Sequence, residues 1–247
     1  MEIKNKVALI TGGTHGIGKH TALKLAAEGV KLSIVARNAA TSKIEREINN
    51  VGGECITLNA DLSKSDECIR VVNTTIGMLG GIDLLVHSAG SSAPGNLLSV
   101  ANYVWYNAFD IHVHAAFHLC KAAVPSMKRR GGGSIILISS AAGIRGVKNA
   151  LAYAVVKGAL PQFTRALAFE LGDDNIKVNC VSPGVIRTRF QDYLTPEQVK
   201  NNIDNRIPLH REGKPADVAD AICMLIKNDF ITGENLVIDG GMTMRIV

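Results

Sequence analysis

The sequence is poor in aromatic residues: Phe, Trp and Tyr make up 4% of its 247 residues, with a single Trp. This scarcity argues against a nucleic-acid surface built on base stacking. Its longest apolar runs, such as Ile135–Ile138, are far shorter than the roughly 18 residues of a membrane span. At 47% hydrophobic and 20% charged, the composition also differs from that of disordered chains and coiled coils. We therefore expect a globular protein that does not enter a membrane.

Cysteine is sparse too, and its pattern excludes two kinds of site. The five cysteines are odd in number and no pair has the C-x-x-C spacing. They predict reduced core thiols and neither a disulfide framework nor a zinc site. Met1–Lys6 leads directly into an apolar segment without the h-region of a signal peptide, which favours a cytoplasmic location.

The charge is moderately basic, with 27 Lys and Arg against 22 acidic residues and a net charge of +5. These cations are dispersed along the chain, and the longest basic run is Lys128–Arg130. We expect that run to be a solvated face. The sequence therefore predicts no nucleic-acid partner and no membrane surface.

Short β-branched runs alternate with longer amphipathic segments along the whole chain. Uninterrupted apolar runs are typical of parallel strands covered on both faces. We expect seven strands, at Lys6–Ile10, Lys31–Val35, Glu54–Asn59, Ile82–Val86, Ser134–Ser139, Ile176–Val181 and Asn235–Ile238. We expect helices at about 17–28, 40–51, 63–78, 100–129, 150–171 and 215–227. The pattern predicts the α/β class, as a single doubly wound Rossmann-type domain over residues 1–247 with helices on both faces of a parallel sheet.

Three local signals refine these boundaries. Ser63-x-x-Asp66 has the spacing of a capping box, and Pro215 suits the first turn of a helix. The polar stretch 187–213 follows the sixth strand, at the edge where open sheets bind ligands. A segment of this length is either a lid or a plain loop, and Thr195-Pro196-Glu197 predicts a short helix within it.

A glycine-rich loop follows the first predicted strand. Gly12 permits a tight turn, Gly16 allows a ligand to approach the backbone, and Gly18 lets the next helix pack on the strand. The helix N-terminus then offers N–H groups to a pyrophosphate. The spacing is G-x-x-x-G-x-G rather than the commoner G-x-G-x-x-G. In this position the loop predicts a dinucleotide site.

The end of the second strand distinguishes the two nicotinamide dinucleotides. An NAD site usually has a carboxylate there, whereas an Arg accommodates a 2′-phosphate. The sequence has Ala36-Arg37-Asn38 and no acidic residue before Glu45. We therefore expect NADP(H) rather than NAD(H). His15 either adds partial positive charge on the same side or is an ordinary exposed loop histidine.

Tyr153 and Lys157 lie four residues apart on a predicted helix and so share one face. A lysine charge beside a phenol lowers its pKa from the usual ~10, so that the tyrosine can serve as an acid or base near neutral pH. Ser140, at the end of the fifth strand, can donate a hydrogen bond to a carbonyl oxygen.

These motifs resemble those of the short-chain dehydrogenases/reductases over nearly the whole chain, most closely the 3-oxoacyl-carrier-protein reductases. The matching motifs are Thr11-Gly12-(x)3-Gly16-x-Gly18, Asp61-Leu62, Ser140, Tyr153-(x)3-Lys157, Val178-Asn179-x-Val181-x-Pro183-Gly184, Gly213-x-Pro215-x-Asp217-Val218-Ala219 and Ile231-Thr232-Gly233 followed by Asp239-Gly240-Gly241.

The resemblance implies roles for individual residues. Tyr153 would exchange a proton with the substrate oxygen, Ser140 would orient that oxygen, and Lys157 would also bind the nicotinamide ribose. Asp61 and Leu62 would lie by the adenine. The full set of implied or predicted cofactor-binding residues is Gly12, Thr14, His15, Gly16, Ile17, Gly18, Arg37, Asn38, Asp61, Leu62, Ser88, Ala89, Gly90, Tyr153, Lys157, Pro183, Gly184, Ile186 and Thr188. The family also implies a homotetramer or homodimer built on the helices at 100–129 and 150–171.

The sequence departs from the family pattern at two places. His87-Ser88-Ala89-Gly90 stands where the family usually has Asn-Asn-Ala-Gly, and His112 stands where it usually has an Asn that holds a water chain. His112 is either a replacement relay in the catalytic set or a helix-packing histidine. His114 and His118 have a spacing that could ligate a metal, but no acid or Cys completes a site, so we expect none.

The motifs together predict an NADP(H)-dependent oxidoreductase that interconverts a small secondary alcohol and a ketone, with Tyr153 as acid and base. Two alternatives stay open. The first is a 3-oxoacyl-carrier-protein reductase, which Lys128–Arg130 would suit and Asp173-Asp174 would not. The second is a cofactor-binding regulator with weakened activity, suggested by His87, Ser88 and His112.

Overall fold

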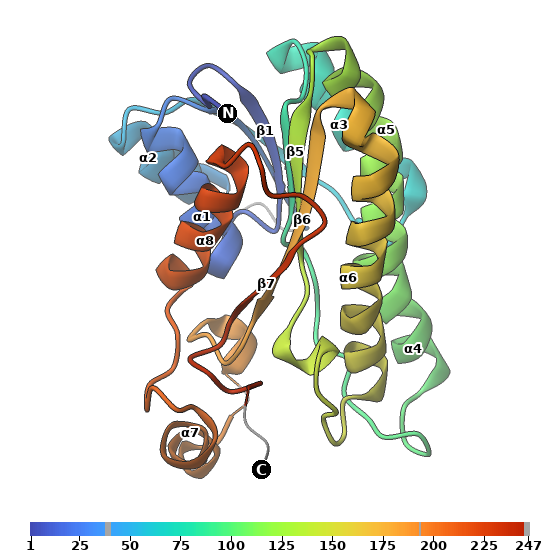
Figure 1. Ribbon diagram of the computed structural model, residues 1–247, viewed down its shortest axis with the longest axis vertical. Coiled ribbons are helices and arrows are strands. Elements are labelled where there is room, and N and C mark those ends of the chain that lie inside the picture. Colours follow the sequence, from blue (N-terminus) through green and yellow to red (C-terminus); the bar gives the residue numbers. More distant parts are fainter. Residues whose placement is uncertain (38–40, 193, 245–247) are drawn as a thin grey trace.

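The apolar segments predicted as strands form one sheet of seven parallel strands in the computed structural model of the chain, which describes residues 1–37, 41–192 and 194–244 (Figure 1). The strand order is β3-β2-β1-β4-β5-β6-β7. The bounds are β1 Val7–Thr11, β2 Lys31–Ala36, β3 Cys55–Asn59, β4 Leu84–His87, β5 Gly133–Ile138, β6 Ile176–Pro183 and β7 Asn235–Ile238. Strands β2 and β3 lie on one side of β1, and β4 to β7 lie on the other, so the strand order reverses between β1 and β4. A crevice for a ligand is expected between the carboxyl ends of these two strands.

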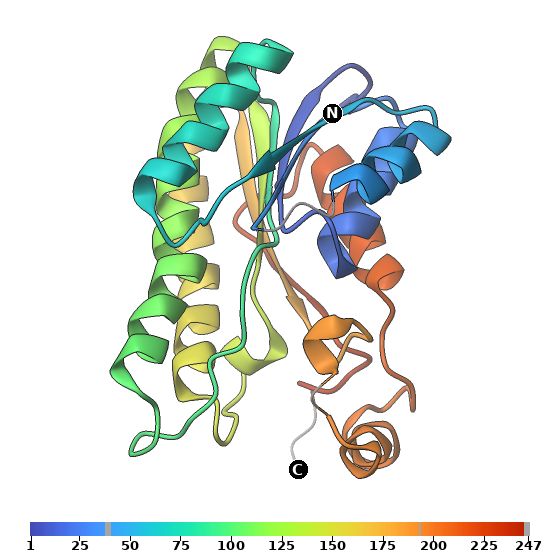
Figure 2. The same ribbon diagram turned by 180° about the vertical axis from the view of Figure 1, so that it is seen from behind.

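Helices cover both faces of this sheet, as Figures 1 and 2 show. Helices α1, α2 and α8 lie on one face, and α3, α4, α5 and α6 on the other. Their bounds are α1 Gly16–Ala27, α2 Thr41–Asn50, α3 Ser65–Leu79, α4 Asn102–Phe109, α5 Ala115–Arg129, α6 Leu151–Leu171 and α8 Pro215–Lys227. Each helical layer buries its own apolar core against the sheet, one around Leu25 and Ile34 and the other around Leu119 and Val178. The predicted doubly wound fold is confirmed.

The predicted capping box at Ser63 and Asp66 is wrong. Helix α3 begins at Ser65 with Lys64 as its N-cap, and no side chain caps it. The Ser63 hydroxyl instead donates to Asp61 Oδ1 at 2.8 Å, and the Ser63 N–H donates to the same oxygen. This local Asx turn leaves the Ser63 side chain unavailable to the helix.

The segment 100–129 is not one regular helix. A π-helical turn, Asp110–His114, separates α4 from α5. A π-turn shifts the backbone register, and such turns are frequent at functional sites. Here the Ile111 carbonyl oxygen receives a hydrogen bond from the His87 side chain at the end of β4.

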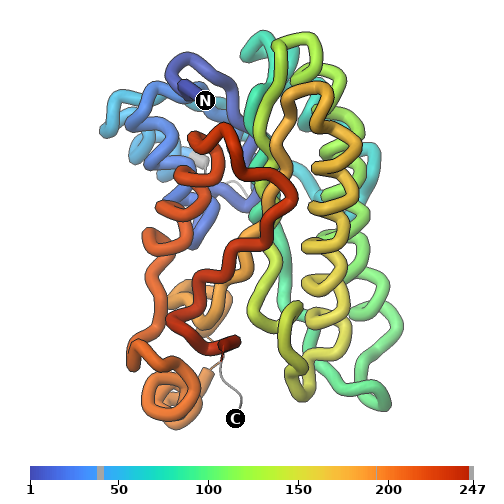
Figure 3. Tube along the Cα trace, in the orientation of Figure 1, coloured from blue at the N-terminus to red at the C-terminus, as the bar shows by residue number. Residues whose placement is uncertain are grey.

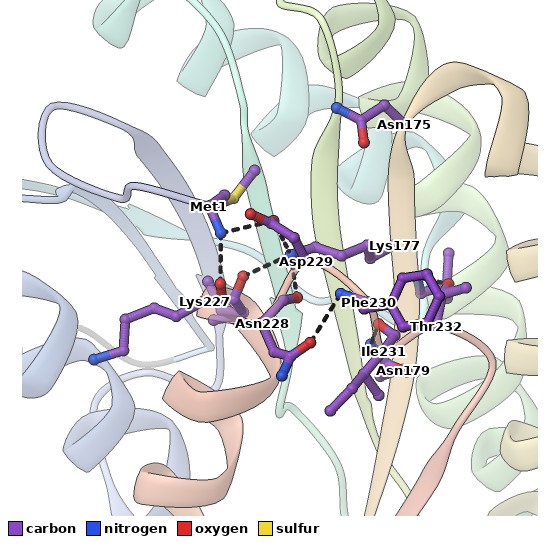
Figure 4. A network of polar contacts seen from close by, with 12 residues as sticks. Met1, Asn175, Lys177, Asn179, Lys227, Asn228, Asp229, Phe230, Ile231 and Thr232 are labelled. Carbon is purple, nitrogen blue, oxygen red and sulfur yellow. Dashed lines mark hydrogen bonds and ion pairs between the residues drawn. The ribbon is translucent and has the colours of Figure 1, made fainter.

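A polar network joins the end of α8 to the start of β6 (Figure 4). Lys177 Nζ donates to the carbonyl oxygens of Ile226 and Asn228 and pairs with Asp229 at 3.0 Å. The ammonium group of Met1 contacts the same Asp229 carboxylate at 2.7 Å. A cation at a helix C-terminus complements the helix dipole, so Lys177 stabilises the position of α8 against the sheet.

The segment after β6 lies outside the sheet, at the carboxyl edge of its strands. The chain trace in Figure 3 places it at the same end as the start of α6. It contains the predicted short helix, α7 Pro196–Asn201. The Thr195 hydroxyl accepts the N–H of Gln198, and the side-chain oxygen of Gln198 accepts the N–H of Thr195. Within the described part of the chain, no helix has the length and apolarity needed to cross a membrane.

Candidate active site

The glycine loop lies in the crevice between the carboxyl ends of β1 and β4. Gly12 has φ +66°, and a Cβ there would lie 2.8 Å from the Ala89 backbone nitrogen. A Cβ on Gly18 would lie 2.5 Å from the carbonyl oxygen of Gly12. Real Cβ atoms do not tolerate such distances, so these two glycines allow the close packing that the sequence predicted.

Gly16 opens the first turn of α1 and has φ +52°. A Cβ on this residue would lie 3.2 Å from Cγ2 of Thr188. Thr188 therefore sits beside the free N–H groups of α1, although 172 residues separate it from Gly16. Ile17, the next residue of the helix, is half-buried against the core. An anionic group fits at this helix N-terminus.

His87 connects the glycine loop to the π-turn. Its Nε2–H donates to Ile111 O at 3.1 Å, because a carbonyl oxygen can only accept. Its Nδ1 therefore accepts from the Thr11 hydroxyl at 2.8 Å, and Thr11 Oγ1 in turn accepts from the Ala89 N–H. Complete burial, with a contribution from Lys157, lowers the pKa of His87 to about 4. The imidazole is neutral, and it fixes the Ser88–Gly90 turn.

Arg37 and Asp61 are both exposed, at the carboxyl ends of β2 and β3. A hydrogen bond from the Ser63 hydroxyl lowers the pKa of Asp61, and Arg37 lowers it further. Leu62, the next residue after Asp61, is buried in the core. Asn38 lies outside the described residues.

His15 is exposed and makes two side-chain contacts. Arg189 donates to its Nε2 at 3.0 Å, so its Nδ1–H donates to the Thr14 hydroxyl at 3.0 Å. Burial, Arg189 and two lysines lower the pKa of His15 below 6.5. His15 is thus an exposed, neutral loop histidine, and the positive charge beside it is that of Arg189.

Tyr153 and Lys157 occupy the first turns of α6. Lys157 Nζ lies 5.6 Å from the centroid of the Tyr153 ring. The ammonium group donates to the Ile138 carbonyl oxygen at 2.7 Å. Because the side chain is buried, its pKa falls to about 8. Lys157 therefore still carries a positive charge beside Tyr153 at neutral pH.

Ser140 follows β5 and caps a short 3-10 turn, Ala141–Gly143. Its Oγ accepts the N–H of Ala142 at 3.1 Å. This bond occupies a lone pair and leaves the hydroxyl hydrogen to donate elsewhere. The Ser140 oxygen is thus held in place near the helix that carries Tyr153, and its hydrogen is available to donate.

His112 is buried at the π-turn beside Tyr153. The two rings meet edge to face with centroids 5.9 Å apart. His112 Nε2 lies 3.0 Å from the Ser91 carbonyl oxygen, and the ring covers Gly90 so closely that a Cβ there would clash with it. Burial and the charge of Lys157 hold the pKa of His112 well below 6.5. The ring is closely packed, and one ring nitrogen, Nδ1, has no hydrogen bond within the described residues.

The residues that follow β6 form another wall of the candidate active site. Gly184 N–H bonds to Ile238 O, and a Cβ on Gly184 would lie 2.7 Å from Asp239. Pro183 ends β6, and Ile186 is buried and bridged to Gly213. These contacts direct the following residues, 187–190, towards the glycine loop and α6.

Two residues that the structure brings into the site were not predicted from the sequence. The Phe190 ring lies 5.7 Å from the Tyr153 ring, and Arg189 contacts His15. An aromatic residue and an arginine directly after Thr188 were the available signals. Their partners, however, are 37 and 174 residues away in the sequence.

Metal binding has no support among the residues that the structure describes. His114 Nδ1 contacts Asp110 at 2.9 Å, and the His118 ring packs edge-on against Phe117. No group of three potential metal ligands occurs in residues 1–37, 41–192 and 194–244.

The arrangement suits a nicotinamide dinucleotide. Glycines clear the backbone at the N-terminus of α1, and Arg37 lies exposed at the carboxyl end of β2. Near the start of α6 a tyrosine, a buried lysine and an oriented serine lie together. Such a set can exchange a proton with an oxygen atom beside the carbon that takes or gives a hydride.

Comparison with known sequences agrees with this geometry. The sequence profile of a family described as enoyl-(acyl carrier protein) reductase matches residues 12–243. Dehydrogenase/reductase SDR family member 4 of Oryctolagus cuniculus is 35% identical over 251 residues, covering 99% of this chain and 96% of the relative. An uncharacterized oxidoreductase of Thermotoga maritima is 34% identical over 252 residues, covering 98% of this chain and 99% of the relative.

Solved structures extend the similarity to the whole fold. A 7α-hydroxysteroid dehydrogenase complexed with NADH and 7-oxo glycochenodeoxycholic acid has a TM-score of 0.93 and 31% identity, covering 100% of this chain and 97% of the other. L-sorbose reductase of Gluconobacter frateurii, complexed with NADPH and L-sorbose, has a TM-score of 0.93 and 29% identity, covering both chains completely.

Proposed function

The chain belongs to the short-chain dehydrogenase/reductase family, and from this premise we propose that it is an NADP(H)-dependent oxidoreductase that interconverts a small secondary alcohol and a ketone. The observation that carries the proposal is the cluster at the start of α6. Tyr153 lies beside a buried ammonium group, and Ser140 presents a fixed hydroxyl nearby.

The proposed mechanism assigns each residue a separate task. The nicotinamide supplies or accepts the hydride when it is bound. In the reducing direction Tyr153 gives its phenolic proton to the carbonyl oxygen of the substrate, and in the oxidising direction it takes the proton back. The Ser140 hydroxyl donates to the same oxygen and orients it. The Lys157 charge stabilises the phenolate that remains on Tyr153.

The preference for NADP(H) rests on Arg37. The guanidinium group stands at the end of β2, where a 2′-phosphate would be bound, and no carboxylate occupies that position. The test is to replace Arg37 with Asp and measure kcat/KM for both cofactors. We expect the ratio of NADPH to NADH efficiency to fall by roughly tenfold or more. An unchanged ratio would contradict the assignment of Arg37.

Segment 187–213 would act as the lid over the substrate. Phe190 packs against Tyr153, so the proposed pocket has an aromatic wall directly beside the proton donor. This wall favours a compact ketone with an apolar part. Lys128 pairs with Asp174, and Arg130 pairs with Asp83. Two of the three cations in Lys128–Arg130 are therefore already paired within the chain, which weakens the alternative of an acyl-carrier-protein substrate.

The proposal is tested by mixing the protein with NADPH and a panel of ketones and following the loss of NADPH absorbance. We expect turnover that Tyr153→Phe reduces by about 10²–10⁴-fold, with NADPH affinity retained. Acyl-carrier-bound ketones in the same panel test the first alternative. Tight NADPH binding without turnover of any ketone would favour the regulator instead.

We also propose a homotetramer or homodimer in the cytoplasm. Exposed aromatic side chains lie on both long helical segments: Tyr103 and Tyr106 on α4, Phe117 on α5 and Phe169 on α6. All five cysteines are free thiols, which suits a reducing compartment. Light scattering of the purified protein tests the oligomeric state, and a monomer at micromolar concentration would contradict it.

A further inference from the structure

Arg189 links the segment after β6 to the glycine loop. Its guanidinium donates to His15 Nε2 at 3.0 Å across 174 residues of sequence. In the described part of the chain this imidazole is its only polar partner, and no carboxylate lies within ion-pair distance. The neighbouring Arg187 differs in this respect, since it pairs with Glu212. Arg189 is thus a cation without a counter-charge.

The hydrogen-bond roles show that His15 cannot compensate this charge. An arginine only donates, so Nε2 must be the unprotonated nitrogen of a neutral ring. Nδ1–H then donates to Thr14, which satisfies both ring nitrogens. A neutral imidazole holds the guanidinium group in place and leaves its charge intact.

Other positive groups lie around the same point. Lys19 and Lys43 both act electrostatically on His15. The carboxylate of Glu47 pairs with Lys19. Lys43 has no such partner among the described residues. The N-terminus of α1, which begins at Gly16, adds the positive end of a helix dipole. The local field therefore favours a negatively charged ligand.

We propose that Arg189 is a phosphate-binding residue of the dinucleotide site, an inference that rests on the proposed function. The guanidinium group would pair with a phosphate of the cofactor, either the pyrophosphate at the N-terminus of α1 or the 2′-phosphate of the adenosine ribose. Both are phosphate oxyanions that a guanidinium fork matches.

Arg189 also connects the cofactor to the substrate wall. The next residue, Phe190, packs its ring against Tyr153. Fixing the Arg189 side chain on a phosphate therefore fixes the backbone that carries Phe190. Binding of the cofactor at one end of the crevice would in this way order the aromatic wall at the other end.

The test measures dissociation constants of NADPH, adenosine 2′,5′-bisphosphate and ADP for the full chain and for Arg189→Gln. We expect NADPH to bind roughly tenfold to hundredfold more weakly to the variant, and Arg189→Lys to recover part of the loss. A loss confined to the bisphosphate assigns the 2′-phosphate, whereas an equal loss for ADP assigns the pyrophosphate. The matched control is Arg129→Gln, which removes the same charge at the last residue of α5 and should leave all three dissociation constants unchanged.

The KM of the ketone tests separately whether Arg189 binds a phosphate and whether it positions Phe190. Arg189→Gln should raise both the NADPH dissociation constant and the KM of the ketone, while Phe190→Leu should raise only the KM. Unchanged NADPH affinity in Arg189→Gln would overturn the inference. Failure of the unmodified protein to bind NADPH or NADH would instead overturn the proposed function.

Discussion

The hydroxyl of Ser139 donates a hydrogen bond to the backbone carbonyl oxygen of Lys157 at 2.6 Å. In a regular helix that oxygen would accept the N–H of residue 161, but residue 161 is a proline and has none. Ser139 fills the vacant position and attaches the end of β5 to the turn that carries Tyr153 and Lys157.

Replacement of Ser139 with Ala should therefore weaken both the fold and the site. The variant leaves a buried carbonyl oxygen without a donor, which costs about 1–3 kcal/mol. We expect this loss in the free energy of unfolding measured with urea. Ser134→Ala is the matched control, because Ser134 is buried on the same strand and its hydroxyl has no partner within the described residues.

A second substitution distinguishes this cause from a general packing defect. Pro161→Ala restores an N–H that can bond to Lys157 O, so the double variant Ser139→Ala/Pro161→Ala should recover most of the stability lost by Ser139→Ala alone. Strict additivity of the two changes in unfolding free energy would show that they do not share this carbonyl oxygen.

Because the pKa of His87 is lowered in the fold, we expect the protein to lose stability in mild acid. Its pKa is about 4 in the fold and 6.5 when exposed, so between these values the unfolded chain binds a proton that the folded chain does not. Stability therefore falls as the pH drops from about 6.5 to about 4, by about 3 kcal/mol in total. The measurement is urea unfolding at several pH values.

The Asn that the family usually has at this position provides the control for His87. His87→Asn has no group that titrates there, so the stability advantage of the wild type over this variant should shrink as the pH falls through the same window. His112 titrates in both proteins, and His87 is the smallest of the four contributions to its pKa, so most of the effect of His112 cancels from the difference. A constant difference between pH 7.5 and pH 4 would contradict the prediction.

We expect the buried charge of Lys157 to lower the stability of the fold while it supports activity. Burial lowers its pKa from 10.5 to about 8, so at pH 7 the fold holds a charge in an unfavourable place. Lys157→Met should unfold at a higher temperature at pH 7 while losing activity. Above pH 8 the folded lysine loses its proton before the unfolded one does, so wild-type stability rises relative to the variant and the gain should shrink towards pH 10.5. A gain that stays constant with pH would count against this explanation.

The fold could be predicted closely because each of its signals is local. Strands β2 and β7 and helix α8 begin at the predicted residues, since apolar runs and Pro215 determine them within a few residues of sequence. The glycine loop and the Tyr153–Lys157 pair were recognisable for the same reason: their residues lie within one or two turns of each other.

Contacts between distant loops could not be predicted in this way. The π-turn at Asp110–His114 has no pattern of its own, because five residues are too few to show a period different from that of the α-helices on either side. The bonds of His87 to Thr11 and Ile111 span 76 and 24 residues. The sequence showed that His87 and His112 were unusual for the family, but only the fold shows what each ring contacts.

His112 offers the sharpest test of the catalytic set, because one ring can serve as a relay or as a packing element. Its Nε2 is engaged by Ser91, so a relay to Lys157 would have to use the lone pair of Nδ1. Protonation would remove that lone pair and lower activity, and since the pKa is well below 6.5 this loss should appear only in acid. His112→Asn should therefore alter the acid limb of the pH–rate profile, while His114→Asn, an exposed histidine on the same turn, should leave it unchanged. His112→Phe keeps an aromatic ring against Tyr153 but has no nitrogen. If His112→Phe retains the rate and the pH profile of the wild type, the ring acts by packing alone; if its kcat falls with His112→Asn retaining more activity, the nitrogen takes part in moving the proton.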